Sequence, residues 1–250
     1  MPTKQSELYT IDGHKNIIIS NTSNSTITIN GNDSEELKDA LKSLHRSSQN
    51  LIANIRNQIG GSLHFERQTI LDDIIQAVAD YPMTIIHGHA GIGKSGITKS
   101  FVEKALIDSA QVFAFKGDEL IGNSLDEILS KKVGFTVDTE GSLKNGLLSQ
   151  KTIVWVDSLE KLLENNQKDA FIDLLKLISK NADVRLVVTI RTYALAQLRF
   201  SFMEHQLTKI KTIEIPPLSN DEQKAVLQPF PFLQPLFDNP KIESLMRTLF

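Results

Sequence analysis

The sequence predicts an α/β fold in which a parallel β-sheet is covered by helices on both faces. Helical and strand-like segments alternate from residue 63 onward. Most of the strand-like segments are continuous apolar runs, as expected of strands that are buried on both faces. Such alternation is typical of parallel strands joined by crossover helices. We expect five strands, at residues 83–87, 112–116, 152–156, 185–190 and 211–215.

Helices are expected between these strands, because apolar residues recur there at helical spacing. The expected ranges are 66–80, 94–108, 124–132, 167–180 and 193–199, with a further helix from Ser219. Ser219 and Glu222 have the spacing of a capping box, in which each side chain accepts a hydrogen bond from the other residue's backbone. This pattern fixes the start of the last helix.

Two segments precede this region. The β-branched runs KNIIIS and STITIN are separated by turn residues and predict a small β-rich element over residues 1–33. Residues 34–62 predict an amphipathic helix of about 25 residues and a linker, with Ser34 as helix cap and Gly60-Gly61 as its end. The apolar stripe of this helix either packs on the following domain or forms an oligomerisation arm. Its members are Leu37, Leu41, Leu44, Leu51, Ile52, Ile55 and Ile59.

Composition excludes several classes of function. The net charge is −3, from 27 basic and 30 acidic residues, so no overall attraction to nucleic acid or to an anionic membrane is expected. No apolar run approaches the roughly 18–20 residues that span a bilayer, and residues 1–13 lack the apolar core of a signal peptide. The absence of cysteine excludes disulfides and thiolate metal sites. We therefore expect a cytoplasmic protein with no membrane partner and no direct nucleic-acid binding.

A phosphate-binding loop is predicted at residues 88–95, GHAGIGKS, which fit G-x-x-x-x-G-K-[ST] between a strand and a helix. The backbone N–H groups of such a loop, together with the positive end of the following helix, hold phosphates. Lys94 is expected to reach the β- and γ-phosphates, and the Ser95 hydroxyl to ligate Mg²⁺. The expected nucleotide-binding residues are Gly88, His89, Ala90, Gly91, Ile92, Gly93, Lys94, Ser95 and Gly96.

Three charged residues at strand ends are candidates for catalysis. Asp157 ends the apolar strand TIVWV, so its carboxylate is expected beside Ser95 as a second magnesium ligand. Glu160 follows three residues later and is a candidate for orienting or deprotonating a water molecule. Arg191 follows the next strand and either contacts the γ-phosphate or is an ordinary surface arginine. A turn-forming Asp157 and a solvated Glu160 are the corresponding structural alternatives.

The stretch IPPLS at residues 215–219 predicts a rigid corner, because each proline fixes its own backbone and restricts the residue before it. Pro217 is a candidate for the border of a base-binding pocket. Simple closure of the loop explains the prolines equally well, so both interpretations stand at this point.

Taken in order, GHAGIGKS, IVWVDSLE, VVTIRT and IPPLS resemble the STAND class of P-loop ATPases, and above all its NACHT-type members from bacterial defence and signalling proteins. The resemblance covers about residues 63–250. It implies a three-layer P-loop NTPase domain with sheet order 5-1-4-3-2 and with ATP or ADP and Mg²⁺ as ligands. It also implies a switch that rests with ADP, self-associates on binding ATP, and links an unidentified trigger to an unidentified effector.

The chain departs from the family pattern at two places. NACHT-type chains usually carry an acidic pair after the strand-ending aspartate, whereas here Glu160 is followed by Lys161, so water activation depends on one carboxylate. The chain also ends within what resembles the first part of the family's helical domain. We therefore expect the NTPase domain at residues 63–228 and the start of a truncated helical domain at residues 229–250.

The sequence bears on three other functions. Residues 166–169, NQKD, fit a loose guanine-recognition pattern, but they lie at a helix start, and residues 157–160 lack the glycine of the GTPase motif DxxG. A motor or remodelling ATPase of the AAA+ kind would share the fold and turn over quickly. A non-catalytic module would use the nucleotide only as a structural ligand. The last two alternatives differ from a switch in turnover, which the sequence does not determine.

Overall fold

The computed structural model describes residues 17–19, 27–29, 35–59, 63–64, 67–133, 151–202, 209–242 and 247–248. The expected helix cap at Ser34, the helix end at Gly60-Gly61, most of the 1–33 element and part of residues 229–250 lie outside these ranges. None of the helices in the described ranges is both long enough and apolar enough to cross a membrane.

The five predicted strands form one parallel sheet. They are β5 (Met83–Gly88), β6 (Gln111–Lys116), β7 (Thr152–Asp157), β8 (Val184–Arg191) and β9 (Ile210–Glu214). Their order is β6-β7-β8-β5-β9, with every neighbouring pair parallel. Numbered along the chain this is 2-3-4-1-5, which is the expected order in reverse. The predicted fold is confirmed.

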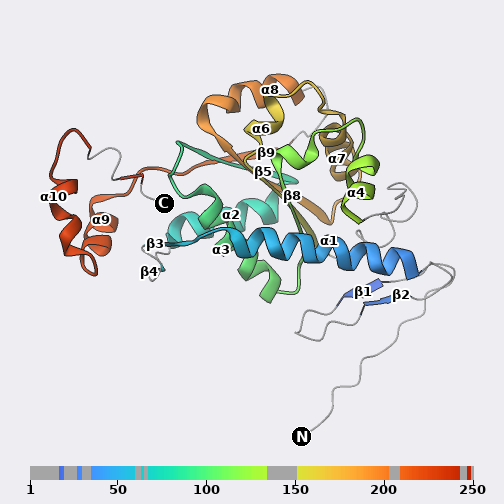
Figure 1. Ribbon diagram of the computed structural model, residues 1–250, viewed down its shortest axis with the longest axis horizontal. Coiled ribbons are helices and arrows are strands. Elements are labelled where there is room, and N and C mark those ends of the chain that lie inside the picture. The colour runs from blue at the N-terminus through green and yellow to red at the C-terminus, as the bar shows by residue number, and fades with distance from the viewer. Residues whose placement is uncertain are drawn as a thin grey trace, which may run out of the picture.

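Helices cover both faces of the sheet (Figure 1). On one face lie α2 (Gln68–Asp80) and α3 (Lys94–Ile107), whose buried residues share a core with Trp155. On the other lie α4 (Leu125–Val133), α6 (Glu160–Leu163), α7 (Asp169–Ser179) and α8 (Leu195–Phe202). The sheet thus separates two apolar cores, as a strand buried on both faces requires.

Shorter elements complete the chain. The 3₁₀ helices are η1 (Gly117–Leu120), η3 (Thr192–Ala194) and η5 (Pro231–Leu233). The last α-helices, α9 (Asn220–Leu227) and α10 (Gln234–Phe237), lie beyond the end of the sheet in Figure 1. The predicted capping box is present, since the Ser219 amide donates to Glu222 Oε2 at 2.7 Å and the Glu222 amide donates to Ser219 Oγ at 3.2 Å.

The helix α1 (Glu35–Asn54) covers the edge of the sheet at β6. Ser48 Oγ accepts a hydrogen bond from the Ala114 amide of β6 at 2.9 Å. The Ala114 N–H, which lies on the open edge of the sheet, thus has an acceptor. Leu41 and Leu44 belong to one core, whereas Leu51 and Ile52 belong to the other. The interpretation that the apolar stripe packs on the domain is confirmed for these four residues.

The expected extent of this helix was too long. It ends at Asn54, and Ile59 lies in a short strand, β3 (Gln58–Ile59), which pairs antiparallel with β4 (Leu63–His64). The pairing partner follows the helix in sequence, so helical spacing alone did not reveal it. In the N-terminal element, β1 (Ile17–Ile19) and β2 (Ile27–Ile29) pair antiparallel, as the two β-branched runs predict.

Candidate nucleotide-binding site

The predicted phosphate-binding loop connects β5 to α3. Gly91 and Gly93 have φ values of 74° and 92°, a left-handed conformation that disfavours residues with a β-carbon. Gly93 is the residue before the first turn of α3, so the loop turns sharply onto the helix. Lys94 begins that helix, and its Nζ donates to the carbonyl oxygens of Gly88 at 3.1 Å and His89 at 2.8 Å. The ammonium group therefore lies over the loop.

None of the residues that the structure describes forms an ion pair with Lys94. Burial lowers the pKa of its ammonium group, and Arg191 acts in the same direction, whereas the carboxylates of Glu160 and Asp157 oppose the shift. An anion bound at the loop would stabilise the charged form of a lysine in this environment. The loop is thus suited electrostatically to phosphate.

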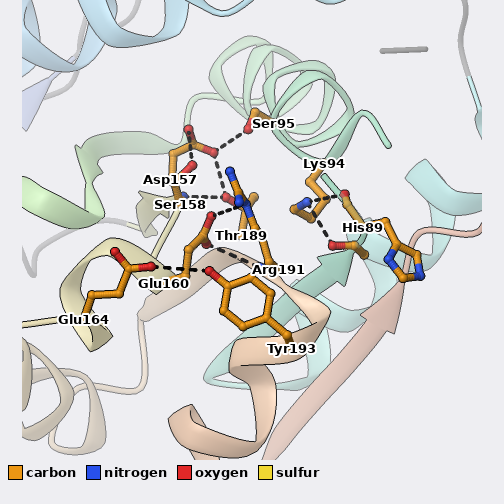
Figure 2. A network of polar contacts seen from close by, with 11 residues as sticks. His89, Lys94, Ser95, Asp157, Ser158, Glu160, Glu164, Thr189, Arg191 and Tyr193 are labelled. Carbon is orange, nitrogen blue, oxygen red and sulfur yellow. Dashed lines mark hydrogen bonds and ion pairs between the residues drawn. The ribbon is translucent and has the colours of Figure 1, made fainter. Parts of the chain in front are cut away.

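A hydrogen-bond network connects the loop to the ends of β7 and β8 (Figure 2). Asp157 Oδ1 accepts from Ser95 Oγ and from Thr189 Oγ1, each at 2.6 Å. Thr189 Oγ1 accepts in turn from the Ser158 amide at 2.9 Å. Adjacent hydroxyl and carboxylate oxygens are the ligand types that Mg²⁺ takes from proteins when phosphates and water supply the rest.

The described residues contain no group of three or more His, Cys, Asp or Glu side chains arranged to hold a metal ion. The Ser95 hydroxyl and the Asp157 carboxylate fit a magnesium ion whose other ligands would come from nucleotide phosphates and water. This is the mode in which kinases and ATPases hold Mg²⁺.

The turn after Asp157 has a constrained backbone. Ser158 has a φ of 58°, which is uncommon for a residue with a side chain. Two hydrogen bonds to Thr189 hold this turn, one from the Ser158 amide to Oγ1 and one from the Leu159 amide to the carbonyl oxygen at 2.9 Å. The turn leads directly into α6, which begins with Glu160, so its geometry determines where that carboxylate lies.

Glu160 forms an ion pair with Arg191. Arg191 Nε lies 3.1 Å from Glu160 Oε1, and the Arg191 backbone amide donates to Oε2 at 3.3 Å. The Glu160 side chain is 8% exposed and that of Arg191 is 49% exposed. Next to this pair, Tyr193 donates to Glu164 at 3.4 Å, as Figure 2 shows. Lys161, the residue that replaces a second acid in sequence, pairs with Asp118 at 3.2 Å.

A cavity of about 430 Å³ lies beside the loop. The residues that border it include Lys94, Ser95, Ser158, Glu160 and Arg191. The other loop residues from Ala90 to Gly96 also border it. The other lining residues come from the end of α1 and the segment after it, from α2 and α3, and from the Pro–Pro corner; they are Ile55, Arg56, Asn57, Arg67, Leu71, Ile97, Ser100 and Ile215.

Arg67 connects the cavity wall to the Pro–Pro corner. Its guanidinium contacts Glu222 at 2.7 and 3.1 Å, and donates to the carbonyl oxygens of Pro216 at 2.8 Å and Pro217 at 3.4 Å. Burial alone would raise the pKa of Glu222, but hydrogen bonds from Arg67 and from the Ser219 backbone outweigh it and hold that pKa below its usual value. Ile215, and not Pro217, borders the cavity itself.

The profile of one protein family, described as Novel STAND NTPase 1, matches residues 59–248. The chain belongs to this family. The predicted STAND class is therefore confirmed, whereas the narrower NACHT-type likeness stays a prediction. No curated protein is found to match the chain.

Some solved structures are similar to this STAND NTPase but share little sequence with it. A Walker-type ATPase of Pyrococcus abyssi is 14% identical over 77% of this chain and 65% of its own, with a TM-score of 0.49. A katanin structure is 14% identical over 80% of this chain and 65% of its own, with a TM-score of 0.46. S. cerevisiae Hsp104 in complex with casein is 17% identical over 81% of this chain and 32% of its own, with a TM-score of 0.47. This chain thus spans less than two thirds of each.

Several residues at this STAND site were not identified from the sequence. In the sequence Thr189 belongs to the apolar strand VVTI, but a fully buried threonine requires a hydrogen-bond partner. Arg67 and Glu222 lie far apart in sequence, and Arg56 follows a helix without any motif. Their positions depend on tertiary contacts that no local spacing encodes.

Proposed function

We propose that the chain is a regulatory switch of the STAND type that binds ATP with Mg²⁺ and hydrolyses it slowly. The observation that carries the proposal is the convergence of Lys94, Ser95, Glu160 and Arg191 on one cavity, with Asp157 hydrogen-bonded to Ser95 behind them. Phosphoryl transfer needs a phosphate-binding loop, magnesium ligands, a carboxylate that positions water and a cation that contacts the γ-phosphate. The cavity offers a residue for each of these.

Each of these residues has a distinct role in the proposal. The loop amides and Lys94 would bind the β- and γ-phosphates, and Arg191 would contact the γ-phosphate. Ser95 and Asp157 would hold Mg²⁺, which when bound neutralises charge on the phosphate oxygens. Glu160 would orient the attacking water and accept its proton.

The ion pair between Glu160 and Arg191 supports slow hydrolysis. A carboxylate that accepts from both the side chain and the backbone of Arg191 is turned towards that residue and away from water. The γ-phosphate of ATP would compete for the same guanidinium. Glu160 would then be released only when a triphosphate has engaged Arg191, so turnover would depend on a rearrangement of the site.

The wider role is proposed from the family resemblance. It comprises self-association in the ATP state, an ADP-bound resting state, and a cytoplasmic role in signalling or antiviral defence. Light scattering of the chain with ADP and with a non-hydrolysable ATP analogue tests the self-association, which is expected only with the ATP analogue.

Calorimetric titration with ATP, ADP and GTP in the presence of Mg²⁺ tests nucleotide binding, with turnover measured on the same sample. We expect binding of ATP and ADP, weaker binding of GTP, and slow hydrolysis. Lys94→Ala removes the cation over the loop and is expected to abolish ATP binding. A folded Lys94→Ala variant that binds ATP as tightly as the wild type would refute the site. Fast turnover would favour a motor ATPase over a switch.

A further inference from the structure

We infer that Arg56, which lies outside the matched family region, is a ligand for the diphosphate group shared by ADP and ATP. The inference rests on the proposed nucleotide binding. The family profile begins at residue 59, whereas Ile55, Arg56 and Asn57 border the cavity immediately before it. The nucleotide site therefore extends into a segment that the family profile does not describe.

The first argument is the charge balance of the cavity. Four cations border it, namely Arg56, Arg67, Lys94 and Arg191. Arg67 is paired with Glu222 at 2.7 Å, and Arg191 with Glu160 at 3.1 Å. Among the described residues, Lys94 Nζ donates to the backbone carbonyl oxygens of Gly88 and His89, and none forms a hydrogen bond or an ion pair with the Arg56 guanidinium. Arg56 and Lys94 are thus the two cations of this cavity that lack a carboxylate partner among the described residues.

The second argument is the position of the Arg56 backbone. It passes the first turn of α3 so closely that a β-carbon added to Gly96 would lie 3.4 Å from the Arg56 carbonyl oxygen. Gly96 follows Lys94 and Ser95, and the backbone amides of this turn point towards bound phosphate. A guanidinium that begins here is close to the helix end where phosphates bind, and it offers donors in a planar fork that matches phosphate oxygens.

The third argument is that the segment is held in place. Lys99 Nζ, on the second turn of α3, donates to the Ile55 carbonyl oxygen at 2.8 Å. Asn57 Nδ2 donates to Glu103 on the same helix at 3.5 Å. The helix α3 therefore contacts the backbone of the residue before Arg56 and the side chain of the residue after it, while Arg56 itself is exposed and able to meet a ligand. Such a fixed base with an open side chain lowers the entropic cost of the contact.

The test compares Arg56→Ala with Arg46→Ala in the full chain. Arg46 is a matched control, because it is an exposed arginine on α1 that does not border the cavity. Calorimetry with MgADP and MgATP is expected to give an affinity about tenfold weaker for Arg56→Ala with both nucleotides, equivalent to about 1.4 kcal/mol, as for the loss of one charge-assisted contact. Arg46→Ala is expected to stay within twofold of the wild type for both nucleotides.

Hydrogen exchange gives a second measurement that does not depend on turnover. MgADP is expected to slow exchange in residues 51–57 of the wild type, and to do so less in Arg56→Ala at equal saturation. Equal affinities of Arg56→Ala and Arg46→Ala, together with lost binding in Lys94→Ala, would overturn the role of Arg56 and leave the nucleotide site standing. Weaker binding of ATP alone would overturn the assignment to the shared diphosphate. Unchanged binding in Lys94→Ala would overturn the proposed function itself.

Discussion

Thr189→Val tests whether the buried threonine positions Asp157. The substitution preserves shape at a side chain that is 0% exposed and removes only the hydroxyl. Asp157 Oδ1 then loses one of its two donors at 2.6 Å, and the Ser158 amide loses its acceptor at 2.9 Å. A buried N–H without a partner costs about 1–3 kcal/mol, so we expect the free energy of unfolding to fall by about 2 kcal/mol.

The substitution is also expected to weaken the magnesium site. If Ser95 were to ligate a magnesium ion, Thr189 would remain as the near donor to Asp157, since Ser158 Oγ lies 3.4 Å from the other carboxylate oxygen. Loss of a hydrogen bond to a charged group is worth about 1.5 kcal/mol, or about tenfold. We expect Thr189→Val to reduce, by about that factor, the gain in ADP affinity that Mg²⁺ provides.

Two measurements check this expectation. Urea unfolding is followed by the fluorescence of Trp155, the single tryptophan, which is buried on β7 next to the site. Calorimetry with ADP, with and without Mg²⁺, measures the contribution of the metal. Thr189→Ser keeps the hydroxyl and should retain the magnesium effect despite losing a buried methyl group. The reasoning is wrong if Thr189→Val and Thr189→Ser respond equally to Mg²⁺.

Three further predictions concern other contacts. Glu160→Gln should keep ATP affinity within a few fold and slow turnover at least about 100-fold, because an amide does not accept the proton of water; single-turnover assays measure this. Glu222→Gln should lower the free energy of unfolding near neutral pH by about 2 kcal/mol, because it leaves the buried Arg67 without a countercharge. Ser48→Ala should cost about 1–2 kcal/mol in urea unfolding, because a β6 amide loses its acceptor.

The pH dependence of Glu222→Gln follows from the lowered pKa of Glu222. A carboxyl group whose pKa is lower in the folded than in the unfolded state stabilises the fold above the unfolded value of 4.5, and this stabilisation is lost as the pH falls through the folded value. The difference between wild type and variant should therefore shrink below about pH 4.5. A difference independent of pH would contradict the ion pair.

Ser47→Ala is a matched control for Ser48→Ala. Ser47 on the same helix accepts from the Lys132 side chain at 3.0 Å and not from a strand amide among the described residues, so Ser47→Ala should cost less than Ser48→Ala. Equal costs would mean that the edge contact contributes nothing. Unchanged turnover in Glu160→Gln would remove Glu160 from the mechanism and leave its ion pair with Arg191 as a structural contact.

The sheet and the loop were predictable because their causes are local. A strand such as TIVWV, covered on both faces, is apolar throughout, and the loop of GHAGIGKS needs glycine at the positions with positive φ. The strand order was expected from the family resemblance, since apolar runs carry no information about their neighbours. The end of α1 was missed because Ile59 continues the helical spacing yet pairs with Leu63.

The polar contacts of the site were predictable only in part. Asp157 and Arg191 are the last residues of their strands and Glu160 lies just beyond one, and parallel strands bring their ends to one edge, so their convergence could be expected. The hydrogen-bond or ion-pair partner of each residue could not be predicted from the sequence. That Glu160 faces Arg191, that Thr189 holds Asp157, and that Arg67 meets Glu222 depend on side-chain directions fixed by packing across the two cores.

The packing of α1 bears on where the NTPase domain begins. Four of its apolar side chains, Leu41, Leu44, Leu51 and Ile52, are at most 9% exposed and divide between the two cores. At about 2 kcal/mol for each buried side chain, they contribute about 8 kcal/mol as an upper value, which is comparable to the whole stability of a typical domain. The same helix satisfies the β6 edge through Ser48 and ends at the wall of the cavity. These contacts favour α1 as part of the folded NTPase unit. A nucleotide bound beside Arg56 would then stabilise the packing of α1 on the domain. By thermodynamic linkage, the packed helix would strengthen nucleotide binding by the same free energy.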